Sequence, residues 1–348
     1  MKYKGLSLFA NVGIAETYLK EIDFPIVLAN ELLPERVKFY EHLHQHKSIP
    51  GSITEEEVFT DIITQSKKLG VNFILATPPC QGMSVAGRMD SNDPRNTLII
   101  KAMQVFQDLL PEFMLIENVP QMFKTSIIVN GQVVSIKDYL QSIADKHKYS
   151  IQFDIFDAAD YGTPQRRKRS FTRIFKTSYE WNNPIAQSHI TVEQAIGHLP
   201  PLESGEDSGI AYHYSPKHNE NHILWMKHTP TGKSAFENLI HYPKKDNRRI
   251  KGFVTTYKRI NWNKPAPTIT MSNGSISSQN NVHPGRELPD GTYSDARALS
   301  LLEIFKLTGL PDNWSPPSWS KDKLIREVIG EANPPKLVKN IFKGLRKL

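Results

Sequence analysis

The chain has 348 residues, of which 39% are hydrophobic and 23% charged, and 43 Lys+Arg against 36 Asp+Glu give a formal net charge of +7. No apolar run approaches the roughly 20 residues that span a bilayer, and the first residues lack a signal-peptide pattern. We therefore expect a soluble cytoplasmic protein, nucleoid-associated if bacterial, with no membrane partner. Its single cysteine excludes an internal disulfide and a multi-cysteine zinc site, and we expect no bound metal.

Up to about residue 178, short β-rich runs alternate with helical runs. Strands are expected over residues 5–10, 25–31, 71–78, 113–119, 149–158 and 169–176, and helices over 13–22, 34–46, 96–110 and 135–147. Near-continuous apolar strands separated by amphipathic helices indicate an α/β fold with a mostly parallel, doubly wound sheet. Asp93 before Pro94, and Ser135 with Asp138, are typical helix starts.

From about Trp181 to Ser294 the periodicity fades and His, Asn, Pro, Gly and basic residues dominate. This composition predicts a smaller, loop-rich second domain with short strands. Helical patterns return over 294–310 and 334–348, where Leu337, Ile341 and Leu345 recur at helical spacing. The predicted division is 1–180, 181–294 and 295–348.

Residues that follow the strands of such a sheet are candidates for ligand binding, because ligands sit outside the carboxyl ends of the strands. The candidates of this kind are Phe9 to Gly13, Glu31, Asp61 before the run 71–78, Cys80, Glu117 and Asn118. A glycine-containing turn into a helix with an acid about twenty residues later resembles a nucleotide site whose acid holds ribose hydroxyls. The alternative is that the turn only allows the helix to pack against the strand, as any fold of this kind requires. Asn11 stands where a second glycine is expected, and Asn tolerates left-handed backbone, so we expect the turn to survive.

Cys80 follows two prolines and precedes Gly82. The prolines stiffen an extended segment and Gly82 permits a tight turn, as suits a nucleophile; an inert buried thiol is the alternative. Glu117 could donate a proton to a substrate bound against the thiol. In "QRRKR", Gln165, Arg167 and Arg169 share one face of a strand, where they form either a solvated edge or a clamp for a phosphate or base.

Together these strings resemble the cytosine-C5 DNA methyltransferases, particularly those of bacterial restriction systems. "PPCQGMS" resembles the nucleophile motif, "ENVP" the acid motif, "QRRKR" the Gln-x-Arg-x-Arg motif, and "RINWNKPAPTIT" the motif that organises the recognition domain. The final segment with "IGEANPP" resembles the segment that returns to the catalytic domain. The order agrees along nearly the whole chain apart from roughly residues 181–255.

The resemblance implies methyl transfer from S-adenosylmethionine to C5 of a flipped-out cytosine in a specific sequence of double-stranded DNA. The implied catalytic residues are Cys80, Glu117, Arg167 and Arg169. The implied cofactor-binding residues are Phe9, Gly13, Glu31, Leu32, Asp61, Pro79 and Leu98. The implied substrate-binding residues are Gln81, Gly82, Ser84, Asn118, Val119, Gln165, Arg259 and Thr268. We expect a monomer, with a cognate restriction endonuclease as a possible partner.

The middle segment then becomes a target-recognition domain. Its candidate phosphate-neutralising residues are Lys244, Lys245, Arg248, Arg249, Lys251, Lys258 and Arg259. Asn11, Thr60 before Asp61, and Glu331 in "GEANPP" depart from the family pattern and bear on cofactor binding.

Three alternatives remain. A tRNA cytosine methyltransferase on the same fold is expected to carry a Cys-Phe-Thr string, which this single-cysteine chain lacks. A non-catalytic DNA-binding module is the second alternative, and the presence of both Cys80 and Glu117 argues against it. A nicotinamide-dependent oxidoreductase does not account for the three motifs together.

Overall fold

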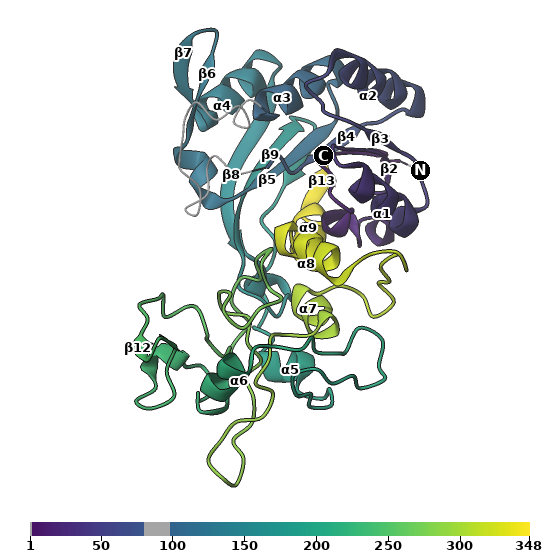
Figure 1. Ribbon diagram of the computed structural model, residues 1–348. Helices are drawn as coiled ribbons and strands as arrows, with labels where there is room; N and C mark the ends of the chain where they lie inside the picture. The colour runs from purple at the N-terminus through teal and green to yellow at the C-terminus, as the bar shows by residue number, and fades with distance from the viewer. Residues whose placement is uncertain (1, 80–97) are drawn as a thin grey trace.

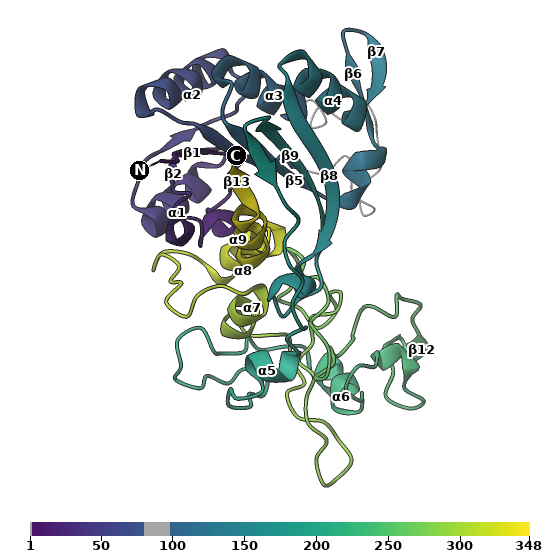
Figure 2. The ribbon, with the colours of Figure 1, turned by 180° about the vertical axis from the view of Figure 1, so that it is seen from behind.

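The computed structural model describes residues 2–79 and 98–348. An upper lobe carries a large sheet between helices, and a lower, loop-rich lobe hangs below it (Figure 1). Seen from behind, the C-terminal helices lie between the sheet and the lower lobe (Figure 2). The predicted nucleophile Cys80, the neighbouring Gln81, Gly82 and Ser84, and the predicted helix start at Asp93 and Pro94 fall outside the described residues.

The main sheet has seven strands in the described residues, in the order β3-β2-β1-β4-β5-β9-β8. These strands are β1 (Gly5–Leu8), β2 (Ile26–Glu31), β3 (Ser48–Pro50), β4 (Phe73–Ala76), β5 (Phe113–Asn118), β8 (Tyr149–Asp157) and β9 (Lys168–Lys176). The first five strands in that order are parallel, while β9 runs antiparallel to both β5 and β8. The predicted mostly parallel α/β fold is confirmed.

Helices cover both faces of the sheet. The helices beside the sheet are α1 (Pro34–His44), α2 (Glu56–Leu69), α3 (Leu98–Leu109), α4 (Ile136–Lys146) and α9 (Pro335–Lys343). Because side chains alternate along a strand, Ile74 of β4 packs in the core that α2, α3 and α4 cover, whereas Phe73 packs in the core that α9 covers. The C-terminal helix therefore completes the hydrophobic core of the N-terminal sheet, with Leu337, Ile341 and Phe342 fully buried.

Short elements connect this framework. The 3₁₀ turns are η1 (Ile14–Glu16), η2 (Lys20–Ile22), η4 (Pro120–Lys124), η5 (Ala158–Tyr161) and η6 (Ala235–Glu237). A hairpin is formed by β6 (Ser126–Val129) and β7 (Gln132–Ser135), and β10 (Tyr179–Trp181) pairs with β13 (Leu345–Lys347). At the start of α4 the Asp138 amide donates to Ser135 Oγ at 3.0 Å, as the sequence predicted.

Some local predictions differ from the structure. The expected helix over 13–22 is two 3₁₀ turns, and no helix was expected where α2 lies and no strand where β3 lies. Leu345 lies in β13 rather than on a helix. Helix α9 ends at Lys343, and a Cβ at the next residue, Gly344, would lie 2.2 Å from the Asn182 carbonyl oxygen, so only glycine fits there.

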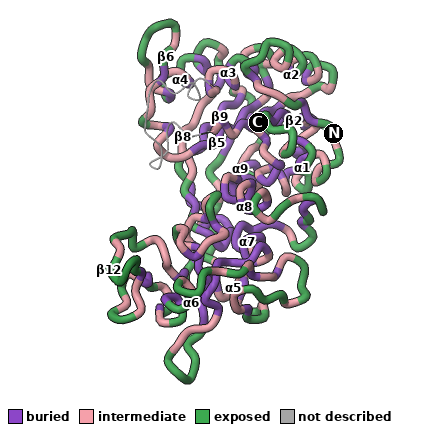
Figure 3. Tube along the Cα trace, viewed as in Figure 1, coloured by how far each residue is buried: buried purple, intermediate pink, exposed green. Residues whose placement is uncertain are grey.

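The lower lobe holds α5 (Val192–Ile196), α6 (Glu220–Lys227), and the short strands β11 (Lys244–Lys245) and β12 (Arg248–Arg249). Helices α7 (Leu301–Thr308) and α8 (Asp322–Glu331) join it to the sheet. Most residues of α7 and of the second half of α8 are buried, whereas the segments around β12 and the lowest loop are largely exposed (Figure 3). Over residues 2–79 and 98–348, no helix is both long and apolar enough to cross a bilayer.

Candidate active site

The carboxyl ends of β1, β2, β4 and β5 lie side by side. Leu8 of β1 is level with Asn30 of β2 and with Ala76 of β4, which is in turn level with Ile116 of β5. The turns that follow these strands therefore meet at one edge of the sheet, as the sequence predicted. Thr77 Oγ1 donates to the Phe9 carbonyl at 3.0 Å and ties the turn after β4 to the turn after β1.

The turn after β1 depends on left-handed backbone. Phe9, Asn11 and Gly13 have φ values of 59°, 51° and 76°. A Cβ at Gly13 would lie 2.0 Å from His44 Nε2, so only glycine fits there. Asn11 adopts the left-handed conformation in place of glycine, and its Nδ2 donates to the Val328 carbonyl of α8 at 3.1 Å. The turn thus survives the substitution, as expected.

Glu31 is fixed at the end of β2. Its Oε2 accepts the Asn11 amide at 2.9 Å and its Oε1 accepts the Leu33 amide at 3.0 Å. Burial raises the pKa of the Glu31 carboxyl, and these two amides oppose that shift. The next residue, Leu32, is 57% exposed and therefore is not part of the core. An oriented carboxylate beside an exposed apolar side chain suits a ribose and the purine attached to it.

Glu331, a departure from the family pattern, has a partner next to Glu31. Its Oε2 lies 2.5 Å from Arg36 Nη1 of α1. Both side chains also act electrostatically on Glu31, since Arg36 lowers the pKa of the Glu31 carboxyl and Glu331 raises it. Helix α8 therefore reaches the ends of β1 and β2 through Asn11 and through this ion pair.

The segment that leads to Cys80 is attached to the acid motif. Asn118 Nδ2 donates to the Pro78 carbonyl at 3.0 Å, and Asn118 Oδ1 accepts the Val119 amide at 2.8 Å. Ser170 Oγ of β9 donates to the Val119 carbonyl at 2.8 Å. Pro79 is half-buried directly after this anchor. The described end of the nucleophile motif thus lies beside the Glu117–Asn118 strand end.

Glu117 and Arg169 form an ion pair across β5 and β9, with Arg169 Nε 3.0 Å from Glu117 Oε1. Burial raises the pKa of the Glu117 carboxyl, while Arg169 and then Arg167 oppose the shift. A carboxyl whose pKa is raised keeps its proton to a higher pH and can donate a proton or hydrogen bond, and the guanidinium beside it can bind a carbonyl oxygen. This pair can therefore act as an acid and an oxygen-binding donor at one ring.

The structure corrects the expectation that Arg167 contacts the base. Its guanidinium is buried and donates to the backbone carbonyls of Ile269, Gly330 and Glu331 at 2.9, 2.9 and 3.0 Å. These bonds join the start of β9 to the lower lobe and to α8. Arg167 is therefore a positioning residue, although its charge still acts on Glu117.

Two further predicted substrate contacts are wrong because the side chains are enclosed. Gln165 Oε1 accepts the Ile269 amide at 3.1 Å, and the residue is buried. Arg259 is fully buried, bonded only to backbone carbonyls in the described residues, and burial lowers its pKa to about 10. It organises the lower lobe rather than neutralising phosphate. Thr268 is half-exposed and donates to the Arg166 carbonyl at 2.8 Å, so its substrate role stays a prediction.

The predicted position of Asp61 at the strand ends is also wrong. Asp61 lies within α2, exposed, and its Oδ1 accepts Gln65 Nε2 at 3.2 Å. The residues that do follow β3 are Gly51 and Ser52, and the Gly51 amide donates to the Glu31 carbonyl at 3.0 Å. The sequence signal that points to Gly51 and Ser52 is the helical pattern of "EEVFTDIITQSKKL", which places Asp61 inside a helix and these two residues before it. Leu98 begins α3, half-buried against the core.

Comparison with known proteins agrees with this geometry. The family model "C-5 cytosine-specific DNA methylase" matches residues 3–347. The chain is 49% identical to the type II methyltransferase M1.HgaI of Avibacterium volantium, over 98% of this chain and 97% of that protein. It is 28% identical to the type II methyltransferase M1.HphI of Haemophilus parahaemolyticus, over 80% and 69%.

A solved structure gives the same fold. The Entamoeba histolytica methyltransferase EhMeth superposes with a TM-score of 0.67 at 16% identity, over 99% of this chain and 98% of that chain. The match of the family model along the chain, together with the paired acid and arginine at the strand ends, shows that the chain belongs to the C-5 cytosine-specific DNA methylase family.

Proposed function

We propose that this protein transfers a methyl group from S-adenosylmethionine to C5 of a cytosine flipped out of a specific sequence in duplex DNA, as the modification enzyme of a restriction–modification system. The observation that carries the proposal is the Glu117–Arg169 pair beside the anchored Pro78–Pro79 segment. The printed names of its relatives M1.HgaI and M1.HphI support the restriction–modification setting.

The residues at the ends of β1 and β2 fit S-adenosylmethionine. Asn11 Oδ1 is buried without a hydrogen-bond partner in the described structure, and so are both amide atoms of Asn333 after α8. Buried polar atoms require hydrogen-bond partners, and the ammonium and carboxylate groups of the methionine part of S-adenosylmethionine would provide them. Glu31 would hold the ribose hydroxyls and the exposed Leu32 would cover the adenine. When bound, S-adenosylmethionine supplies an electrophilic methyl group.

The protein's own groups then act on the cytosine ring. Cys80, which lies outside the described residues, is the proposed nucleophile: its thiolate adds to C6, and the electron pair of the C5–C6 double bond moves to C5. Glu117 donates a proton or hydrogen bond to ring N3, and Arg169 binds the carbonyl oxygen as charge develops. The electron pair at C5 takes the methyl group and turns the cofactor into a neutral thioether. A water molecule then accepts the C5 proton, the C5–H electrons re-form the C5–C6 double bond, and the C6–S bond breaks to release the Cys80 thiolate.

The segment 181–294 is the proposed target-recognition domain, between a catalytic domain over 1–180 and a returning segment over 295–348. A base in a duplex is reachable only after flipping, at a cost of a few kcal/mol that protein–DNA contacts offset. The protein acts as a monomer on double-stranded DNA, and a cognate endonuclease would cut the same sequence.

The test uses duplex DNA in which 5-fluorocytosine replaces cytosine. Fluorine at C5 blocks the final proton loss, so the enzyme should stay covalently joined to the DNA in the presence of S-adenosylmethionine. Mass spectrometry should locate the adduct at Cys80, and the Cys80→Ser variant and an unsubstituted duplex should give none. An intact, cofactor-binding protein that forms no adduct on fragments covering a whole genome would contradict the proposal, and an adduct with tRNA alone would favour the RNA alternative.

A further inference from the structure

The hairpin of β11 and β12 projects from the lower lobe, away from the sheet (Figure 1). Lys244 pairs with Arg249, and Lys245 pairs with Arg248. The two turn residues, Asp246 and Asn247, have φ values of 51° and 58°. Positive φ at both central positions defines a type I′ turn, whose twist matches that of the two strands. All six residues from 244 to 249 are exposed.

Each cross-strand pair of this hairpin joins two positive charges. Like charges placed directly opposite one another destabilise a hairpin. Among the residues that the structure describes, none forms an ion pair with Lys244, Lys245 or Arg248. The hairpin itself offers a single acid, Asp246, in the turn. No ion pair within the described residues therefore compensates the charges of Lys244, Lys245 and Arg248, and an anionic partner would do so.

One face of the hairpin is attached to the lobe. Arg249 Nη2 donates to the carbonyls of Phe236 at 2.9 Å and Asn238 at 2.6 Å, and its guanidinium lies 4.2 Å from the Tyr242 ring centroid. Because neighbouring residues in a strand point to opposite faces, Lys245 and Arg248 occupy the face opposite to this anchor. The anchor fixes the orientation of that free cationic face relative to the lobe.

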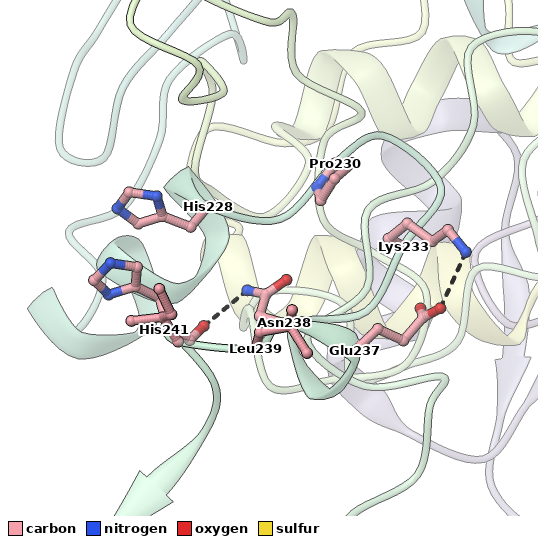
Figure 4. A pocket seen from close by; sticks show the side chains of 8 residues that line it. His228, Pro230, Lys233, Glu237, Asn238, Leu239 and His241 are labelled. Carbon is pink, nitrogen blue, oxygen red and sulfur yellow. Dashed lines mark hydrogen bonds and ion pairs between the residues drawn. The ribbon is translucent and has the colours of Figure 1, made fainter.

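The cavity beside the anchor is lined by no comparable unpaired cation among the described residues. It has a volume of about 510 Å³ and is lined by His228, Pro230, Lys233, Glu237, Asn238, Leu239, Ile240 and His241 (Figure 4). In this cavity Lys233 Nζ lies 3.2 Å from Glu237 Oε1, so its charge is already paired. The two imidazoles stack with centroids 3.8 Å apart. Among the described residues, the cations near this cavity that form no ion pair therefore include those of the hairpin and, two residues after it, the exposed Lys251.

We propose that Lys245 and Arg248 contact the phosphate backbone of duplex DNA and that the hairpin is a phosphate-binding ribbon of the recognition lobe. The inference rests on the proposed function for the identity of the polyanion. A cation that neutralises a phosphate releases a condensed counterion, so each contact contributes about 0.9 to the slope of log affinity against log salt concentration. Loss of both contacts should lower that slope by about 2.

The experiment measures binding of the full-length protein to a short fluorescein-labelled duplex of mixed sequence by anisotropy across a salt series. The test variant is Lys245→Gln/Arg248→Gln. The matched control is Lys67→Gln/Lys68→Gln, which removes the same charge from two exposed positions of α2 on the other lobe. A charge-preserving variant, Lys245→Arg/Arg248→Lys, tests whether charge alone is responsible.

The expected result is a slope reduced by about 2 in the test variant and unchanged in the control and in the charge-preserving variant. An unchanged slope in the test variant, or an equal reduction in the control, would overturn the proposal. The readout needs no methyl transfer. A failure of the 5-fluorocytosine experiment would therefore reject the proposed function without deciding this one, and the salt series would still give its own answer.

Discussion

Replacing either Arg167, directly before β9, or Arg169, within β9, with methionine should separate fold from chemistry. Arg167 donates to three backbone carbonyls that belong to the lower lobe and α8. Each buried carbonyl left without a donor costs about 1–3 kcal/mol. Methionine restores apolar packing, and the Glu331 carbonyl is only partly buried. We therefore expect Arg167→Met to lower the free energy of unfolding by about 3–5 kcal/mol.

Arg169→Met, two residues further along the chain and within β9, is the matched comparison. Arg169 pairs with Glu117 near the surface of the site, where both side chains keep some exposure. After the substitution Glu117 can take up a proton, since burial already raises its pKa. The expected loss of stability is therefore about 1 kcal/mol or less, whereas methyl transfer should fall by about a hundredfold or more.

Urea denaturation followed by circular dichroism measures the first quantity, and tritium transfer from labelled S-adenosylmethionine to DNA measures the second. The reasoning fails if Arg167→Met keeps wild-type stability yet loses turnover, because Arg167 would then act on the substrate rather than on the fold. It also fails if Arg169→Met unfolds the protein.

Three further predictions concern the cofactor side. Burial raises the pKa of the Glu16 carboxyl from 4.5 to about 8, so its contribution to stability is present below pH 4.5 and is lost as the pH rises towards 8. In Glu16→Gln, denaturation midpoints should fall less between these two pH values than in the wild type. An unchanged profile of midpoint against pH would contradict the prediction. Arg36→Gln should weaken calorimetric S-adenosylmethionine binding about fivefold, and adding Glu331→Gln should change little more; additive losses would show that the two side chains act independently. Gly13→Ala should destabilise the protein by about 2 kcal/mol or more and weaken cofactor binding. Its control is Gly131→Ala, which has a similar φ but no atom within 4 Å of the added Cβ, so it should lose only the free energy of its backbone strain. Equal losses of stability in the two variants would show that contact of the added Cβ with His44 contributes nothing.

The sequence by itself determined six of the seven strands described in the main sheet, the turns after β1 and β5, and the family. Runs of apolar residues predict parallel strands wherever both faces are covered. Short strings such as "FANVG" and "ENVP" carry their chemistry with them, because each lies within one strand-to-helix turn. For this reason Glu31, Glu117 and the left-handed Asn11 were all predicted from residues close to them in the chain.

Tertiary structure decided what each buried polar residue touches. The sequence pattern places Arg167 and Arg169 on one strand face. In the structure, however, Arg167 donates to a backbone carbonyl of α8, whereas Arg169 forms an ion pair with Glu117. Arg259 could not be separated from the exposed basic residues around it until the carbonyls that enclose it were known. Helix α9 covers a sheet that begins more than three hundred residues earlier. Contacts of this kind join distant segments, and periodicity, which reports only on neighbours along the chain, carries no information about them.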